Sequence, residues 1–128
     1  MSNYTVLIIE DNIINRKVFK DILSVNGFET IEAEDGEEGY SMAKKHHPDL
    51  IVMDVQLPGE NGYELTRRLK REDDSKDIPI IIVTSFAMAG EKNEAKAAGC
   101  NDYLTKPINI HQFIDTIKKY LPDRDSKK

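Results

Sequence analysis

Acidic residues stand directly after two apolar runs of this sequence. Glu10-Asp11 follows residues 6–9, and Asp54 follows residues 50–53. If the fold brings these carboxylates together, their negative charges raise one another's pKa unless a cation neutralises the group. A cluster of oxygen ligands selects a hard ion, and Mg²⁺ is suitable because it accepts one or two carboxylates, keeps several waters and takes phosphate oxygens as further ligands. The acidic residues therefore predict a Mg²⁺ site.

A hydroxyl pair and a lysine stand at the ends of two other strand-like segments. Thr84-Ser85 follows residues 80–83, and Lys106-Pro107 follows residues 103–105. The Thr84 hydroxyl can donate to one phosphoryl oxygen, and the Lys106 ammonium can act as a point charge on another. Together with Mg²⁺, these groups would stabilise the charge that develops during phosphoryl transfer. Asp54 is then the predicted nucleophile, and the product is an acyl phosphate.

Five strands and five helices are predicted to position these residues. The continuous apolar runs at 6–9, 50–53 and 80–83 are typical of strands that are covered on both faces of a parallel sheet. The segments 28–33 and 103–105 are weaker strand candidates. Helices are expected over about 12–26, from a cap at Asp35 to about 46, from a cap at Asn61 past Leu69, over an alanine-rich stretch ending at Gly99, and up to Pro122.

The first helix is expected to carry its apolar face on Ile14, Val18, Ile22 and Val25, which recur at helical spacing. Gly27 follows as the predicted left-handed residue that ends this helix.

The strand–helix order predicts an α/β fold with a doubly wound, five-stranded parallel sheet. Right-handed crossovers between parallel strands are compatible with the flavodoxin-like strand order 2-1-3-4-5, which places the first and third strands side by side. Ligands of such sheets bind at the carboxyl ends of the strands, where the strand order reverses. All of the candidate site residues are predicted at that edge.

Length and charge limit the classes of function. The 128 residues suit one domain, expected over 1–122, followed by a polar tail over 123–128. Lys and Arg total 18 against 23 Asp and Glu, so the net charge of -5 argues against direct binding of nucleic acid or of an anionic membrane. A single cysteine, Cys100, and the lack of a signal-like or membrane-spanning run predict a cytoplasmic protein.

The ordered set Glu10-Asp11, Asp54, Thr84, Tyr103 and Lys106-Pro107 resembles the receiver domain of two-component response regulators. The resemblance covers about residues 5–121. The Glu10-Asp11-Asn12 start and the run over residues 84–88 look most like DivK-type single-domain regulators.

The resemblance implies how such a domain works. A histidine kinase or a histidine phosphotransfer protein would donate a phosphoryl group to Asp54. Asp11 and Asp54 would bind Mg²⁺ directly, Gln56 would give its backbone carbonyl, and Glu10 would act mostly through water. The domain would assist its own phosphorylation and a slow loss of phosphate, without being an enzyme in the usual sense.

The resemblance also implies a switch. Thr84 and Tyr103 would move on phosphorylation and alter the surface of the fourth helix, fifth strand and fifth helix, where a downstream protein would bind. A cis bond is expected between Lys106 and Pro107. Phe86 is expected to shield the acyl phosphate from water, which would slow the loss of phosphate.

Other functions share parts of this layout. A flavin carrier would need a hydroxyl-rich phosphate loop in place of Glu10-Asp11-Asn12. An aspartyl-phosphate hydrolase usually carries a second acid two residues after its nucleophile, where this chain has Gln56. A receiver-shaped docking module without phosphorylation is a third alternative. The sequence leaves open whether the chain stands alone or belongs to a larger hybrid kinase, and whether it is a monomer or a weak dimer.

Overall fold

The structure, a computed structural model, describes residues 4–85 and 91–122. Within these residues strands and helices alternate in the order β1 (Thr5–Ile9), α1 (Ile13–Val25), β2 (Glu29–Ala33), α2 (Gly36–His46), β3 (Leu50–Asp54), α3 (Gly62–Arg71), β4 (Ile80–Thr84), α4 (Glu91–Ala98), β5 (Asp102–Thr105) and α5 (Ile110–Tyr120). All strand pairs are parallel, and the sheet order is β2-β1-β3-β4-β5. The predicted fold and strand order are confirmed.

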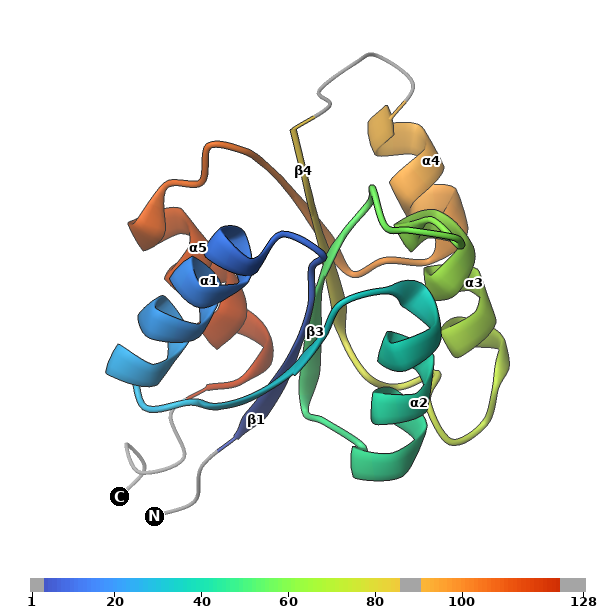
Figure 1. The fold of residues 1–128 in the computed structure, drawn as a ribbon, viewed down its shortest axis with the longest axis horizontal. Helices are drawn as coiled ribbons and strands as arrows, with labels where there is room; N and C mark the ends of the chain where they lie inside the picture. The colour runs from blue at the N-terminus through green and yellow to red at the C-terminus, as the bar shows by residue number, and fades with distance from the viewer. Residues whose placement is uncertain (1–3, 86–90, 123–128) are drawn as a thin grey trace.

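The helices cover both faces of the sheet (Figure 1). α1 and α5 lie on one face, while α2, α3 and α4 lie on the other. A separate apolar cluster fills each space between sheet and helices. On the α1 and α5 side, the rings of Phe19 and Phe113 pack with their centroids 5.4 Å apart. Burial of the sheet on both faces explains why its central strands are continuously apolar. Among the described residues, no helix has the length and apolar character needed to cross a membrane.

Polar side chains start four of the helices. Asn12, Asp35, Asn61 and Asn109 each accept a hydrogen bond from the backbone N–H three residues further on. Such caps satisfy backbone donors that have no partner within the helix, and each is worth about 1 kcal/mol. The caps at Asp35 and Asn61 were predicted from the sequence. Gly27 has a φ of 90°, which agrees with the left-handed end predicted for α1.

The predicted apolar face of α1 is right for Ile22, which packs against the apolar cluster, and wrong for the other three residues. Ile14 is 70% exposed and Val25 is 85% exposed, whereas Phe19 and Leu23 are buried. Two apolar stripes run along this helix, and helical spacing alone does not decide which of them faces the sheet. The sheet covers the stripe that carries Phe19, because its ring fits against Phe113 of α5. The other stripe, with Ile14, Val18 and Val25, is left exposed to solvent.

Candidate functional site

Strands β1 and β3 bring three carboxylates together at the carboxyl edge of the sheet. Ile9 pairs in register with Met53, so Glu10 and Asp54 follow in neighbouring positions. One oxygen each from Glu10, Asp11 and Asp54 lies within 4.8 Å of the other two. Glu10 is buried, Asp54 is half-buried, and Asp11 is exposed. The structure therefore assembles the acidic group that the sequence predicted from distant positions.

Glu10 is almost fully buried, and its pKa is raised. The first cause is burial, and the second is the negative charge of Asp54. Two donors oppose the shift: the Asn12 backbone N–H lies 3.2 Å from Oε2, and Lys106 Nζ lies 3.2 Å from Oε1. Burial and, after it, the nearby Asp54 charge thus both disfavour the ionised form of Glu10.

Lys106 reaches across the sheet edge from the residue after β5. Its Nζ donates to Asp54 Oδ2 at 3.4 Å as well as to Glu10. Its backbone N–H donates to the Thr84 carbonyl at 2.8 Å, which holds the end of β5 against the end of β4. The Lys106–Pro107 bond is cis, as expected. The lysine charge is thus shared between the buried glutamate and the candidate nucleophile.

The backbone behind Asp54 is closely packed. The N–H of Gly62, the first residue of α3, donates to the Val55 carbonyl at 2.8 Å. A Cβ atom on Gly62 would lie 2.5 Å from the Asp54 carbonyl oxygen and 2.9 Å from Val55 Cα. Only a glycine allows α3 to start this close to the strand that carries Asp54.

Replacing Gly62 with Ala should lower the free energy of unfolding by about 1–3 kcal/mol, because both clashing atoms belong to the backbone and cannot rotate away. Urea unfolding measures the change. Ser41→Ala, at an exposed position of α2, is a suitable control. A loss below about 0.5 kcal/mol would mean that the loop before α3 adjusts easily.

The remaining predicted residues lie on the adjacent strands. Thr84 is fully buried at the end of β4, one residue beyond Val83, the register partner of Asp54. Tyr103 is half-buried on β5 and packs against the apolar cluster under α2, α3 and α4. Gln56 is exposed in the loop after β3, and its N–H lies 3.3 Å from Asp54 Oδ1. Phe86 lies outside the described residues.

The donor set fits a hard divalent cation. The three clustered side chains offer carboxylate oxygens only, which are the ligands that Mg²⁺ prefers, and the exposure of Asp11 leaves room for bound water. A cation here would also offset the Asp54 charge, which together with burial raises the pKa of Glu10.

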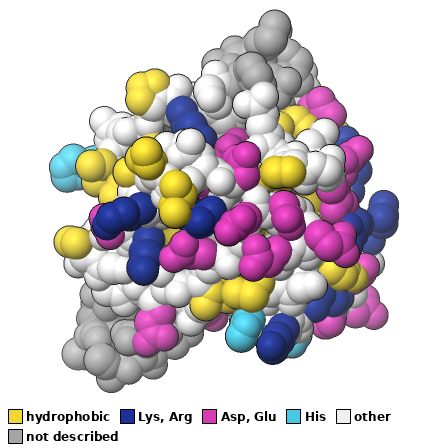
Figure 2. All heavy atoms as spheres, viewed as in Figure 1, with side chains coloured by type: hydrophobic (Ala, Val, Ile, Leu, Met, Phe, Trp, Pro, Cys, Tyr) yellow, Lys and Arg dark blue, Asp and Glu magenta, His cyan; other side chains and the backbone are white. Residues whose placement is uncertain are grey.

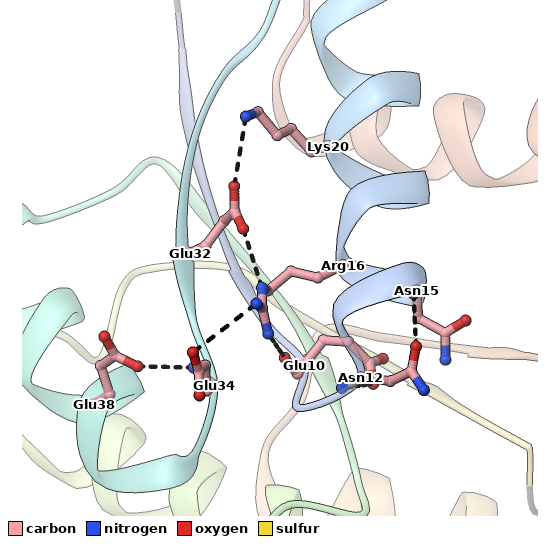
Figure 3. A network of polar contacts seen from close by, with 8 residues as sticks. All are labelled: Glu10, Asn12, Asn15, Arg16, Lys20, Glu32, Glu34 and Glu38. Atoms are coloured by element: carbon pink, nitrogen blue, oxygen red, sulfur yellow. Dashed lines mark hydrogen bonds and ion pairs between the residues drawn. The ribbon is translucent and has the colours of Figure 1, made fainter.

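Sequence reasoning missed Arg16. This residue of α1 is only 8% exposed, and its Nη1 donates to the backbone carbonyl of Glu10 at 2.8 Å. Figure 3 shows the guanidinium between Glu10 and two glutamates of the β2 segment, Glu32 and Glu34. One signal was available: Arg16 stands at helical spacing from Phe19 and Leu23, so it belongs to the stripe that faces the sheet.

The family model for the response regulator receiver domain matches residues 6–118. The chain belongs to this family. The receiver is 46% identical over 119 residues to the polar-differentiation response regulator DivK of Brucella ovis. The matched residues make up 93% of this chain and 97% of that protein. The predicted resemblance to receivers of the DivK type is confirmed, and the receiver takes part in two-component signalling. A flavin carrier and an aspartyl-phosphate hydrolase are both set aside.

Solved receivers share the fold. A putative response regulator from Chloroflexus aurantiacus has a TM-score of 0.90 and 31% identity, over 95% of this chain and 100% of that one. The receiver domain of a sensor histidine kinase from Pseudomonas aeruginosa has a TM-score of 0.87 and 29% identity, with the same coverage. That receiver was solved with a magnesium ion coordinated in its active-site cleft.

Proposed function

We propose that this receiver accepts a phosphoryl group on Asp54 from a phosphohistidine of a histidine kinase or of a histidine phosphotransfer protein. The observation that carries the proposal is the position of Asp54, which lies in the acidic group and within 3.4 Å of Lys106 Nζ. An Asp54 oxygen forms a bond to phosphorus as the phosphorus–nitrogen bond of the donor breaks, and the electron pair of that bond returns to the imidazole.

The residues around Asp54 have separate roles in phosphoryl transfer and metal binding. Lys106 neutralises charge on the phosphoryl oxygens, and the Thr84 hydroxyl donates to one of them. Asp11, Asp54 and the Gln56 backbone carbonyl would hold Mg²⁺, with Glu10 acting through water. Bound Mg²⁺ supplies charge stabilisation to the phosphoryl oxygens. The magnesium in the cleft of the Pseudomonas aeruginosa receiver supports this assignment.

Phosphorylation would then change the α4-β5-α5 face. The new group adds a charge of about -1.5 to -2 next to Thr84 and Lys106. Thr84 ends β4, and Tyr103 lies on the neighbouring β5. A movement of Thr84 towards the phosphoryl group can therefore change the position of Tyr103. A downstream protein would bind the altered face. The domain assists its own phosphorylation and slow dephosphorylation and has no separate substrate.

The unit that carries this function is one receiver domain over residues 1–122 with a tail over 123–128. It acts as a monomer or a weak dimer. Its cytoplasmic location stays a prediction from the sequence.

The exposed stripe of α1 is the surface on which we expect the protein donor to dock. Ile13, Ile14, Val18 and Ile110 are all exposed. Figure 2 shows hydrophobic side chains gathered over α1 and the start of α5, beside acidic side chains at the strand ends. A groove of about 480 Å³ continues this surface, and Val18 and Lys106 both line it. Because Lys106 contacts Asp54, a protein seated on the groove lies next to the nucleophile.

Replacing Ile14 with Glu should therefore slow phosphorylation by a cognate protein donor about tenfold or more, and leave phosphorylation by acetyl phosphate unchanged. Acetyl phosphate is small and needs no docking surface, whereas a buried charge in an apolar interface costs binding energy. Val25→Glu is the matched control, because Val25 is also exposed but lies about 16 Å further along the helix. Equal rates for the two variants with the protein donor would place docking elsewhere.

Incubation with acetyl phosphate tests the function itself. Intact-mass measurement should show one phosphoryl adduct when Mg²⁺ is present and none when the metal is chelated. An adduct that forms equally well without Mg²⁺ would contradict the metal site. The absence of any adduct in Mg²⁺ would favour a docking module that no longer takes phosphate.

A further inference from the structure

Arg16 is a buried charge with partners on two segments of the chain. Arginine is rarely buried unless it is paired, and the partners here are a backbone carbonyl and two carboxylates. Nη1 donates to the Glu10 carbonyl at 2.8 Å, Nε donates to Glu32 Oε1 at 3.0 Å, and Nη2 lies 4.0 Å from Glu34 Oε2. Figure 3 shows that α1 inserts the guanidinium between the end of β1 and the β2 segment.

The contact with Glu10 acts on the peptide unit that leads to Asp11. The carbonyl oxygen of Glu10 belongs to the planar peptide bond between these two residues, so holding that oxygen limits how Asp11 can rotate. The Glu10 backbone N–H is held as well, since it donates to the Ala33 carbonyl at 3.1 Å. Asp11 is exposed and depends on its backbone for its position in the acidic group.

The two glutamates orient the guanidinium. Glu32 accepts from Nε through one oxygen, and its other oxygen lies 3.8 Å from Lys20 Nζ. A planar guanidinium can satisfy an acid on one edge and a carbonyl on the other, which a single ammonium cannot do in a fixed geometry. Arg16 is therefore suited to hold the β1–α1 turn to β2 at a fixed distance.

We infer that Arg16 is a positioning residue that holds the Glu10–Asp11 peptide in the conformation that binds Mg²⁺. This inference rests on the proposed function, because it assumes that the acidic group binds the metal. Partners that orient metal ligands typically change metal affinity about 10- to 100-fold when they are removed. Arg16 does not touch the reacting atoms.

Charge and positioning predict opposite effects for Arg16→Met. If only charge matters, removing the positive charge of Arg16 strengthens cation binding, because that charge repels the metal ion. Loss of the peptide anchor weakens binding, because Asp11 must then be ordered when the metal binds. The sign of the change in Mg²⁺ affinity therefore separates the two roles.

The test is a calorimetric titration of Mg²⁺ into wild type, Arg16→Met, Arg16→Lys, Lys20→Met and Asp11→Asn, with urea unfolding of each variant. We expect Arg16→Met to bind Mg²⁺ about tenfold more weakly than wild type, with Arg16→Lys in between. Lys20→Met, which loses a charge near Glu32 but no contact to Glu10, should bind as well as wild type or slightly more tightly. Equal or tighter binding by folded Arg16→Met would overturn the inference.

Two further measurements keep the result clear. If Arg16→Met does not fold, Glu32→Gln takes its place, because it removes the charge that orients the guanidinium and so weakens its hold on the Glu10 carbonyl. Affinity equal to wild type in both Glu32→Gln and Arg16→Lys would overturn the inference. Asp11→Asn tests the proposed function separately. If it binds Mg²⁺ as wild type does, the metal site is wrong, whereas its loss of binding beside an unaffected Arg16→Met contradicts only the role of Arg16.

Discussion

Replacing Asp54 with Asn should abolish phosphorylation by acetyl phosphate and leave a folded domain. The carboxamide has nearly the same shape and can still accept from the Gln56 N–H, but it cannot attack phosphorus to give an acyl phosphate. Removal of a nucleophile commonly lowers a rate by more than about 10³-fold. Burial and then the Asp54 charge raise the pKa of Glu10, so removing that charge relieves repulsion and should not destabilise the fold. Intact-mass time courses measure the rate.

Asp21→Asn is the matched control for this substitution. Asp21 is exposed on α1 and pairs with Lys17 at 3.1 Å, and such surface ion pairs contribute little to stability. It should be phosphorylated at the wild-type rate. An adduct that accumulates on Asp54→Asn as fast as on wild type would mean that another residue is the acceptor.

Replacing Lys106 with Met should slow phosphorylation about 100-fold and at the same time tighten Mg²⁺ binding. The ammonium contacts Asp54 and Glu10 in the absence of metal, so its loss removes a positive charge that competes with the cation. The same loss removes a charge that would stabilise the phosphoryl oxygens in the transition state, and single groups of this kind are worth about 10²–10³-fold. Titration of Mg²⁺ and the rate of adduct formation measure the two effects separately.

Lys17→Met is the control for charge alone, because Lys17 is exposed on α1 and pairs with Asp21. This substitution should change neither the Mg²⁺ affinity nor the rate of adduct formation appreciably. If Lys106→Met binds Mg²⁺ more tightly but is phosphorylated at the wild-type rate, then Lys106 balances charge in the resting site and has no part in the transfer.

The sheet and the acidic group could be predicted because their signals are strong and local. Each central strand is a continuous apolar run, and the alternation of strands and helices is compatible with the strand order that the structure has. Once that order is known, Glu10 and Asp54 must be neighbours, since they follow paired residues of β1 and β3. The long separation of Glu10 and Asp54 in the sequence does not matter, because the strand order determines which strand ends lie side by side.

The contacts that depend on side-chain packing could not be predicted in the same way. α1 carries two apolar stripes, and the choice between them depends on how Phe19 fits against Phe113 across the helix pair. Arg16 is buried as a result of that choice. Likewise, the bond between Lys106 and Glu10 depends on the reach of a long side chain, which spacing along the chain does not describe.

The most direct test of the account is to locate the phosphoryl group chemically. An acyl phosphate on aspartate is reduced by borohydride to homoserine with release of phosphate, whereas a free carboxylate, a phosphoserine or a phosphothreonine is not. After phosphorylation with acetyl phosphate and Mg²⁺, reduction and peptide sequencing by mass spectrometry, we predict homoserine at position 54 and aspartate at position 11. Homoserine at another aspartate, or an unreduced Asp54 in a protein that carries the phosphoryl adduct, would contradict the account.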